Sequence, residues 1–372
     1  LDKITTGRRI GLGFDIDNDA FEISADTRPT DLEDQLHLMA AKLAFPRWDP
    51  APVIRSKAAA LIGYDSFSGS PQAVLERDLE WLVRGKDPRW KTPDKADFAK
   101  LTAKNFKQFW KPILASGPVE LMLFGDFDRD QAVDAILKTF GALRSRQPAA
   151  VSAEIVSPKF PSPQVGPEIL VHKGDKERAA AMVAWPTGGG LENVRESRKL
   201  EVLTSIFNDR LFEILRSQQG ASYSPQVMNS WPVDFKSGGY IGAQSQLTPD
   251  NIDRFYNVVE LIARDLREKP VSADELQRVV EPLRQLIARA SSGNSFWMSQ
   301  MEGASFNPQK FVALQSLLSD YTVITPQEVQ ALAVKYLDEK KEWKLAVLPE
   351  SSRVAANDNE PEEPFPAVSA SN

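Results

Sequence analysis

Residues 210–227 read RLFEILRSQQGASYSPQV, an amphipathic helix followed by the start of a strand. Upstream, the same helix carries an apolar stripe at helical spacing, made of Leu200, Leu203, Ile206, Phe207, Leu211 and Ile214. We therefore expect a helix over about 193–219 that packs on a sheet and is ended by Gly220 in a left-handed cap. Arg216 lies on the last turn of this helix, and Tyr223 begins the outgoing strand.

Arg216 and Tyr223 have two interpretations at this point. Cations favour helix C-termini because of the helix macrodipole, and Tyr is common in strands. Both residues are therefore compatible with purely structural roles. Taken alone, the residue types favour this structural interpretation over a functional one.

The composition limits the classes of protein to consider. The 372 residues are 42% hydrophobic and 26% charged, which is close to average globular usage. This length favours two domains, each large enough to bury a core. The net charge is −6 and both signs are mixed along the chain, so we expect no nucleic-acid partner. No apolar run approaches the roughly 18–20 residues that a membrane-spanning helix needs.

Cysteine and histidine counts restrict the catalytic chemistry. The chain has no cysteine, which excludes disulfides, thiolate metal sites and cysteine nucleophiles. Its two histidines, His37 and His172, are far apart in sequence, and neither lies in an H-x-x-E-H pattern. A self-contained zinc site usually takes two or three protein nitrogen ligands. We therefore expect no metal site in this chain, and structural roles for both histidines.

The chain repeats an order of elements at an offset of roughly 220 residues. In the first half, the alternating segment 13–27 precedes a helix over 30–45 and a second long helix through 64. The helix LTAKNFKQFWKPIL (101–114) and the apolar strand PVELMLFGD (118–126) follow.

The second half has the matching order. The strand GGYIGAQSQL (238–247) precedes a helix over 248–266 and a long helix from 272. The helix TPQEVQALAVKYL (325–337) and the strand WKLAVLPE (343–350) follow. Capping boxes of the form S/T-x-x-E are expected at the helix starts 30–33, 272–275 and 325–328.

We expect an α+β fold of two homologous domains, each an antiparallel sheet with helices packed on one face. The predicted divisions are an incomplete domain over 1–148, a Pro- and Ser-rich linker over 149–167, a full domain over 168–350 and a disordered acidic tail over 351–372. The first domain lacks counterparts of the early strands EILVHKG and AAAMVAWPT and of the first helix. We therefore expect it to be truncated at its N-terminus.

Two other segments have weaker signals. TGGGLENV (187–194) lacks the Lys-Ser/Thr ending of a P-loop and the G-x-G-x-x-G spacing, so a strand-to-helix loop is the better interpretation. GDFDRDQ (125–131) has alternate acids but lacks the rest of a calcium loop, and a helix N-terminus explains it as well.

Several longer segments resemble the C-terminal half of the pitrilysin/insulinase family of zinc metallopeptidases. In the second domain these are HKGDKERAAAMVAWPT, FNDRLFEILRSQQGASYSPQV and GGYIGAQSQLTPDNI. In the first they are DPRWKTPDKADFAKLTAKNFKQFW and VELMLFGDFDRDQAVDAILKTFGAL. The resemblance covers roughly residues 10–350, and its most specific element is Arg-x6-Tyr, from Arg216 to Tyr223.

The resemblance implies a LuxS/insulinase-like fold in which four homologous domains form two halves that close around a peptide. The family's zinc site lies in the N-terminal half on an H-x-x-E-H helix, whose Glu is the general base. The C-terminal half supplies an Arg/Tyr pair. By this resemblance, Tyr223 donates a hydrogen bond to the scissile carbonyl as it becomes an oxyanion, and Arg216 holds the substrate backbone.

This chain departs from the family pattern in having no H-x-x-E-H among its residues. The resemblance therefore implies the substrate-binding half of a zinc-dependent metalloendopeptidase acting on peptides or unfolded polypeptides, inactive alone. Zinc would belong to the absent N-terminal half or a partner subunit. The alternative is a non-catalytic peptide-binding or structural subunit, like core subunits of respiratory complexes. Relatives with this organisation are often exported in bacteria, which favours the periplasm.

Overall fold

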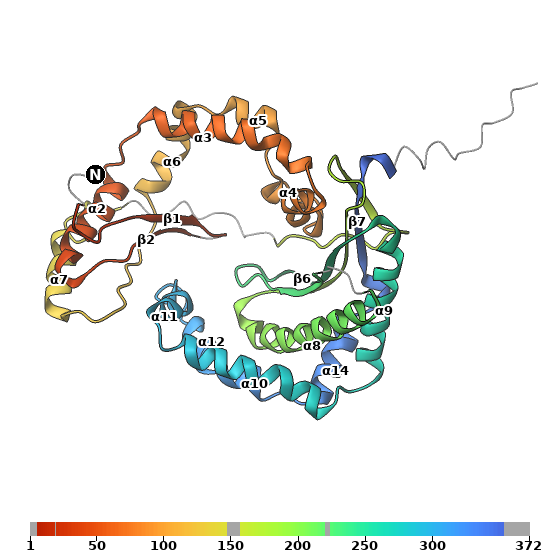
Figure 1. The fold of residues 1–372 in the computed structure, drawn as a ribbon. Helices are drawn as coiled ribbons and strands as arrows, with labels where there is room; N and C mark the ends of the chain where they lie inside the picture. Colours follow the sequence, from red (N-terminus) through yellow and green to blue (C-terminus); the bar gives the residue numbers. More distant parts are fainter. Residues whose placement is uncertain (1–5, 19, 147–156, 220–223, 353–372) are drawn as a thin grey trace, which may run out of the picture.

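The computed structural model describes residues 6–18, 20–146, 157–219 and 224–352, with only the backbone for 216–219. The chain has an α+β fold, as predicted. Figure 1 shows the elements before residue 147 as an arch over those that follow. The linker segment 149–156, Gly220, Tyr223 and most of the predicted tail lie outside the described residues.

The main sheet has five strands, namely β3 (Glu168–His172), β4 (Ala179–Gly188), β5 (Gln226–Ser230), β6 (Ser237–Leu247) and β7 (Trp343–Pro349). Their order is β3-β7-β4-β6-β5. β4 is antiparallel to β6 and β7, whereas β3 is parallel to β7. The prediction of an antiparallel sheet was therefore wrong, because β7 lies between two strands, β3 and β4, that run in opposite directions.

One face of this sheet is covered by α8 (Val194–Gln219), α9 (Ile252–Glu268) and α14 (Pro326–Tyr336), and α10 (Ala273–Ala290) packs against α8. The apolar stripe predicted for α8 is buried here, with Leu203, Ile206 and Phe207 all at 0% exposure. From β4, alternate side chains point into the same core: Ala179, Ala181, Val183 and Trp185.

The opposite face is covered by α4 (Pro71–Val83), which comes from the first half of the chain. Val74 and Leu82 pack in one cluster with the other alternate side chains of β4, among them Met182. Helices therefore cover both faces, not one as predicted. The apolar run AAAMVAW in β4 is typical of a strand buried on both sides.

The first half also contains the antiparallel hairpin β1 (Gly13–Ile16) and β2 (Phe21–Ser24). Its helices include α2 (Leu32–Ala44), α3 (Pro50–Gly63), α6 (Ala103–Ala115) and α7 (Arg129–Lys138). Four shorter α-helices complete the described chain, namely α5 (Lys95–Lys100), α11 (Asn294–Met301), α12 (Gln309–Gln315) and α13 (Leu317–Thr322). Short 3₁₀ helices are η1 (Pro29–Asp31), η2 (Tyr64–Ser68), η3 (Pro88–Trp90), η4 (Leu191–Asn193), η5 (Pro249–Asn251) and η6 (Glu339–Lys341).

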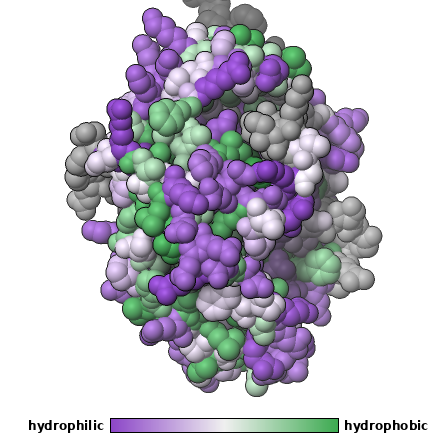
Figure 2. Space-filling view, turned by 90° about the vertical axis from the view of Figure 1, so that its left-hand side faces the viewer, coloured by the Kyte–Doolittle hydropathy of each residue, from purple (hydrophilic) through white to green (hydrophobic). Residues whose placement is uncertain are grey.

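Aromatic side chains join the hairpin to α6. Phe21 contacts Trp110 edge to face at 4.6 Å between ring centroids, and Phe14 contacts the same ring at 5.8 Å. Phe14 and Phe21 are nevertheless 55% and 42% exposed. The side of the molecule that Figure 2 presents mixes hydrophobic residues among hydrophilic ones.

The strand predicted over 118–126 does not form in the described structure. No second strand pairs with β2 among the described residues, so this segment has no ladder to join there. Glu120 instead accepts hydrogen bonds from the backbone N–H groups of Gly303 at 2.7 Å and Ser305 at 3.0 Å. Burial opposes ionisation of Glu120, but the bonds from Ser305 and Gly303 outweigh it and lower its pKa.

Of the three predicted capping boxes, the one at Thr325 is complete, with Glu328 as its partner. Ser272 caps α10 by accepting the Glu275 N–H, but the reciprocal bond of the box is not made there. The box predicted at Thr30 is wrong, because α2 begins after a 3₁₀ turn. The buried Asp31 there accepts the Arg9 N–H at 3.1 Å.

The two halves pack on each other reciprocally. α4 of the first half lies on the sheet of the second, and Tyr240 of β6 donates a hydrogen bond to Glu80 of α4 at 3.0 Å. In return, the segment after α11 binds Glu120 of the first half. Figure 1 shows α4 and α11 at the two places where the arch meets the rest of the chain.

The packing of α4 makes a testable prediction. Leu82 is 2% exposed against the sheet, so Leu82→Ala should lower the free energy of unfolding by about 2–5 kcal/mol. Leu137→Ala on α7, where the side chain is 61% exposed, should change it by about 0.5 kcal/mol or less. Urea denaturation measures both, and equal effects would contradict the packing role of α4.

Candidate functional site

The Arg-x6-Tyr element joins the C-terminal end of α8 to β5. α8 ends at Gln219, as predicted, and Arg216 lies on its last turn. β5 begins at Gln226 rather than near Tyr223. The side chain of Arg216, together with Gly220 and Tyr223, lies outside the described residues. The structure therefore describes the helix that carries Arg216 and the strand that follows Tyr223, and the role of the pair stays a prediction.

Two Asn side chains tie β5 to α8. Asn208 Oδ1 on α8 accepts the backbone N–H of Val227 at 3.1 Å. Asn229 on β5 donates to the Ser197 carbonyl at 3.0 Å. Because each bond joins the helix to the strand directly, the entry of the chain into β5 is held at a defined position beside α8. Sequence reasoning missed both Asn residues.

An ionic cluster holds α8 from its other side. The Arg210 guanidinium forms a two-bond fork with Glu275, at 2.6 and 2.9 Å, and a third bond with Asp265 at 2.7 Å. The bonds from Arg210 keep the pKa of Glu275 below its usual range. A bidentate Arg–carboxylate pair fixes orientation as well as contact. The segment of α8 that leads to Arg216 is therefore anchored to α9 and α10.

β5 lies at the edge of the sheet and pairs only with β6 within the described chain. Alternate residues of an antiparallel edge strand direct their backbone groups away from the sheet. Val227 is one of them, because its N–H bonds Asn208 instead of β6. This outward N–H is therefore already bonded to α8 and is not available to a peptide that pairs with the edge.

A half-buried acid lies on α8 near β5. Burial raises the pKa of Glu201 and outweighs the opposite effect of Asn229. The same carboxylate adds to the effect of burial in raising the pKa of Tyr321 on α13. The raised pKa marks a site where a negative charge is poorly solvated, which is a property of functional acids and of structural ones alike.

The histidines have structural contacts. His172 is fully buried; its Nδ1 accepts the Gly174 N–H at 3.1 Å, and its Nε2 lies 2.8 Å from the Arg178 carbonyl. This network assigns the ring proton to Nε2. His37 is exposed, with Nδ1 3.1 Å from the Glu33 carbonyl. Across the described residues, no three His, Asp or Glu side chains gather as a metal site, so zinc does not fit there.

The glycine run after β4 is a strand-to-helix loop, as predicted. Gly190 has φ +88°, its N–H donates to the Pro232 carbonyl at 2.9 Å, and its own carbonyl accepts Trp231 Nε1–H at 3.0 Å. Asp128 caps α7 by accepting the Gln131 N–H at 2.8 Å, which gives this acid of the segment 125–131 a structural role.

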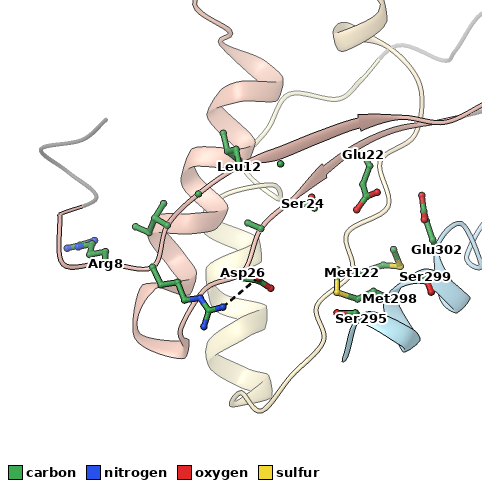
Figure 3. Close-up of a pocket in the computed structure, with 15 residues that line it drawn as sticks. Arg8, Leu12, Glu22, Ser24, Asp26, Met122, Ser295, Met298, Ser299 and Glu302 are labelled. Carbon is green, nitrogen blue, oxygen red and sulfur yellow. Dashed lines mark ion pairs between the residues drawn. The ribbon is translucent and has the colours of Figure 1, made fainter. Parts of the chain in front are cut away.

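A cavity of about 700 Å³ lies between the hairpin, the segment around Met122 and α11. Figure 3 shows Glu22 and Ser24 of β2 on one side and Met298 and Ser299 of α11 on the other. The walls of this cavity come from segments far apart in the chain, so local sequence patterns do not predict it. No described helix has the length and apolar character needed to cross a membrane.

Comparison with known proteins identifies the class of the fold. Residues 100–283 match the sequence model of the peptidase M16 inactive domain. An uncharacterized zinc protease of Mycobacterium leprae is 22% identical over 222 residues, which is 58% of this chain and 48% of that protein. The chain thus spans about half the length of this curated relative.

Solved structures agree in fold. The periplasmic protease PqqL from Escherichia coli superposes with a TM-score of 0.74 at 13% identity, covering 94% of this chain and 38% of that one. A peptidase M16 inactive domain from Pseudomonas fluorescens gives 0.71 at 18% identity, covering 91% and 81%. The chain belongs to the peptidase M16 family, also called pitrilysin/insulinase, as an inactive, C-terminal-type domain.

The link between α8 and β5 can be tested at Asn208. Asn208→Ala leaves the Val227 N–H without its acceptor, so the free energy of unfolding should fall by about 1–3 kcal/mol. Asn208→Asp keeps an acceptor oxygen and should lose less. Hydrogen exchange at Val227 should accelerate in the Ala variant, and unchanged exchange there would disprove the contact.

The raised pKa of Glu201 predicts that the stability of the fold depends on pH. Because its pKa is raised in the folded state, ionisation destabilises the fold as pH rises from the unfolded value of about 4.3 through the raised one. Glu201→Gln should therefore melt at a higher temperature than the wild type at pH 7, and the difference should vanish below about pH 4. Glu213→Gln, at an exposed site on the same helix, is the control. A pH-independent difference would argue against burial as the cause.

Proposed function

We propose that this chain is the substrate-binding half of a zinc-dependent metalloendopeptidase that hydrolyses peptides or unfolded polypeptides. Zinc, its ligands and the general-base Glu would be supplied by a separate zinc-binding half or subunit. The family membership and the relatives named as proteases support this proposal. The observation that carries it is the anchored junction of α8 and β5, which brackets Arg216 and Tyr223.

Within this proposal, Tyr223 donates a hydrogen bond to the scissile carbonyl oxygen as negative charge develops on it. Arg216 holds substrate carbonyl groups with its planar, permanently charged fork. The Asn208 and Arg210 contacts support these roles, because a donor stabilises a transition state only when its position is set beforehand. An extended substrate would run near the free edge of β5.

The partner in this proposal is the zinc-binding half, and the chain alone is expected to be inactive. The name of the Escherichia coli neighbour supports the periplasm as the compartment. A non-catalytic peptide-binding or structural subunit with the same fold is the competing function. The two differ in whether a complete assembly cuts peptides.

A cleavage assay with a quenched, unstructured peptide separates these functions. The chain should be inactive alone and should support cleavage when mixed with a polypeptide that carries the H-x-x-E-H half. Tyr223→Phe should reduce the rate of the mixture by about 10²–10³-fold, because it removes one oxyanion donor. Peptide binding should persist in this variant, since its ring is unchanged.

Tyr64→Phe is the matched control, because it removes a hydroxyl from η2 and keeps the ring contacts with Phe67 and Phe98. A mixture that binds peptide without cutting it would favour the non-catalytic function. Cleavage that is indifferent to Tyr223→Phe would refute the role of Tyr223 while leaving the assembly intact.

A further inference from the structure

The cavity beside α11 lies where two extended segments approach without pairing. β2 pairs with β1 alone within the described residues. The Asp17 N–H bonds the Ala20 carbonyl at 3.0 Å across the turn, which sets the alternation of bonded pairs along the hairpin. Ile23 consequently directs its N–H and carbonyl away from β1. In the described chain, the segment from Val119 to Phe124 makes no backbone–backbone hydrogen bond.

The second half of the chain shows which strand occupies the position that corresponds to the cavity. Its order is a hairpin, a Pro-initiated 3₁₀ turn, several helices and β7, and the first half has the same order up to the segment 118–124. In the second half, β4 lies between β6 and β7 and is antiparallel to both. The first half has a counterpart of β6 in β2 and of β7 in the segment 118–124. It has no described counterpart of β4.

Residue alignment places the cavity at the position of β4. When Leu32, the first residue of α2, is aligned with Ile252 of α9, Ser24 aligns with Gln244. When the first residues of α6 and α14 are aligned, Met122 aligns with Leu345. Gln244 and Leu345 are the two register partners of Met182 in β4. Ser24 and Met122 both line the cavity.

The helix that covers the cavity also corresponds to the helix that covers β4. α4 is the third α-helix after the β1–β2 hairpin and covers Met182 and its neighbours in β4. α11 is the third α-helix after the β5–β6 hairpin, and its Ser295, Met298 and Ser299 line the cavity. Figure 3 shows these side chains across the space from β2. Each half thus covers the other's sheet, and one of the two sheets lacks its central strand.

The lining disfavours an acidic occupant. Arg9 is paired with Asp26 at 3.6 Å and Arg8 with Asp34, while Glu22 and Glu302 add carboxylates to the wall. Met122, Met298 and Leu12 supply apolar surface, and Gly11 and Gly13 allow close approach of a backbone. These features suit a strand of small and apolar side chains, as β4 is.

We propose that this cavity is a strand-docking slot. Its occupant is an uncharged, extended segment with small and apolar side chains, supplied by polypeptide outside residues 1–372. It runs antiparallel to β2 and to the segment 118–124 and hydrogen-bonds the outward backbone of Ile23. This concerns assembly of the first half's sheet and does not depend on peptide cleavage.

The probe is a fluorescein-labelled synthetic peptide with the sequence of β4, AAAMVAWPTG. It should bind the full chain saturably in fluorescence anisotropy, and hydrogen exchange should slow at Ile23 and over 119–124. A peptide of the same sequence with alternate amides N-methylated should not bind, because it cannot complete the ladder. Failure of the unmethylated peptide to bind, or protection elsewhere such as at β5, would overturn the proposal.

Ser299→Trp places an indole in the slot and should weaken binding at least tenfold. The matched control is Ser292→Trp, because both serines are exposed and each donates its hydroxyl to the carbonyl three residues earlier. Circular dichroism confirms that both variants fold. Equal affinity of the two variants would refute the slot. A dimer of the chain that the peptide dissociates would assign the slot to a second copy instead.

Discussion

Both faces of β4 are covered by helices, and the rest of the molecule is arranged around that constraint. Ala181, Val183 and Trp185 face the helices of the second half, while Ala180, Met182 and Ala184 face α4. A strand with no polar face can be stable only when each side is removed from water. α4 therefore has to reach across from the first half, and this contact sets how the halves lie together.

The same constraint explains the difference between the two sheets. The five-stranded sheet has β4 at its centre, and every other strand is placed by reference to it. In the part of the chain that the structure describes, the β1–β2 hairpin has no such strand, and two strands alone are marginally stable in water. Its support comes from Trp110 on one face and from Gln35, whose side chain bonds both the N–H and the carbonyl of Gly11. Beside the hairpin, side chains therefore make contacts that a neighbouring strand makes in the five-stranded sheet.

The proposed function depends on a junction rather than on a pocket of acids and bases. α8 is buried along one side and clamped by Arg210, and Asn208 and Asn229 attach β5 to it. A hydrogen-bond donor placed between such anchored elements costs little reorganisation when charge develops on a substrate. This is why the proposed role of Tyr223 requires the surrounding scaffold as much as the hydroxyl itself.

Local patterns in the sequence determined much of this protein. The apolar stripe of α8, the caps at Ser272 and Thr325, and the order of elements could be read directly, because propensity and periodicity are properties of neighbouring residues. The Arg216–Tyr223 element and its family resemblance were likewise available from sequence.

Only the tertiary structure decided which segments meet. The parallel pairing of β3 with β7, the position of α4 on the second sheet and the unpaired segment 118–124 depend on contacts between residues far apart in the chain. PVELMLFGD has the composition of a strand, yet a strand also needs a partner's backbone, which sequence periodicity does not report. The sequence thus determined the elements, and long-range packing decided their neighbours.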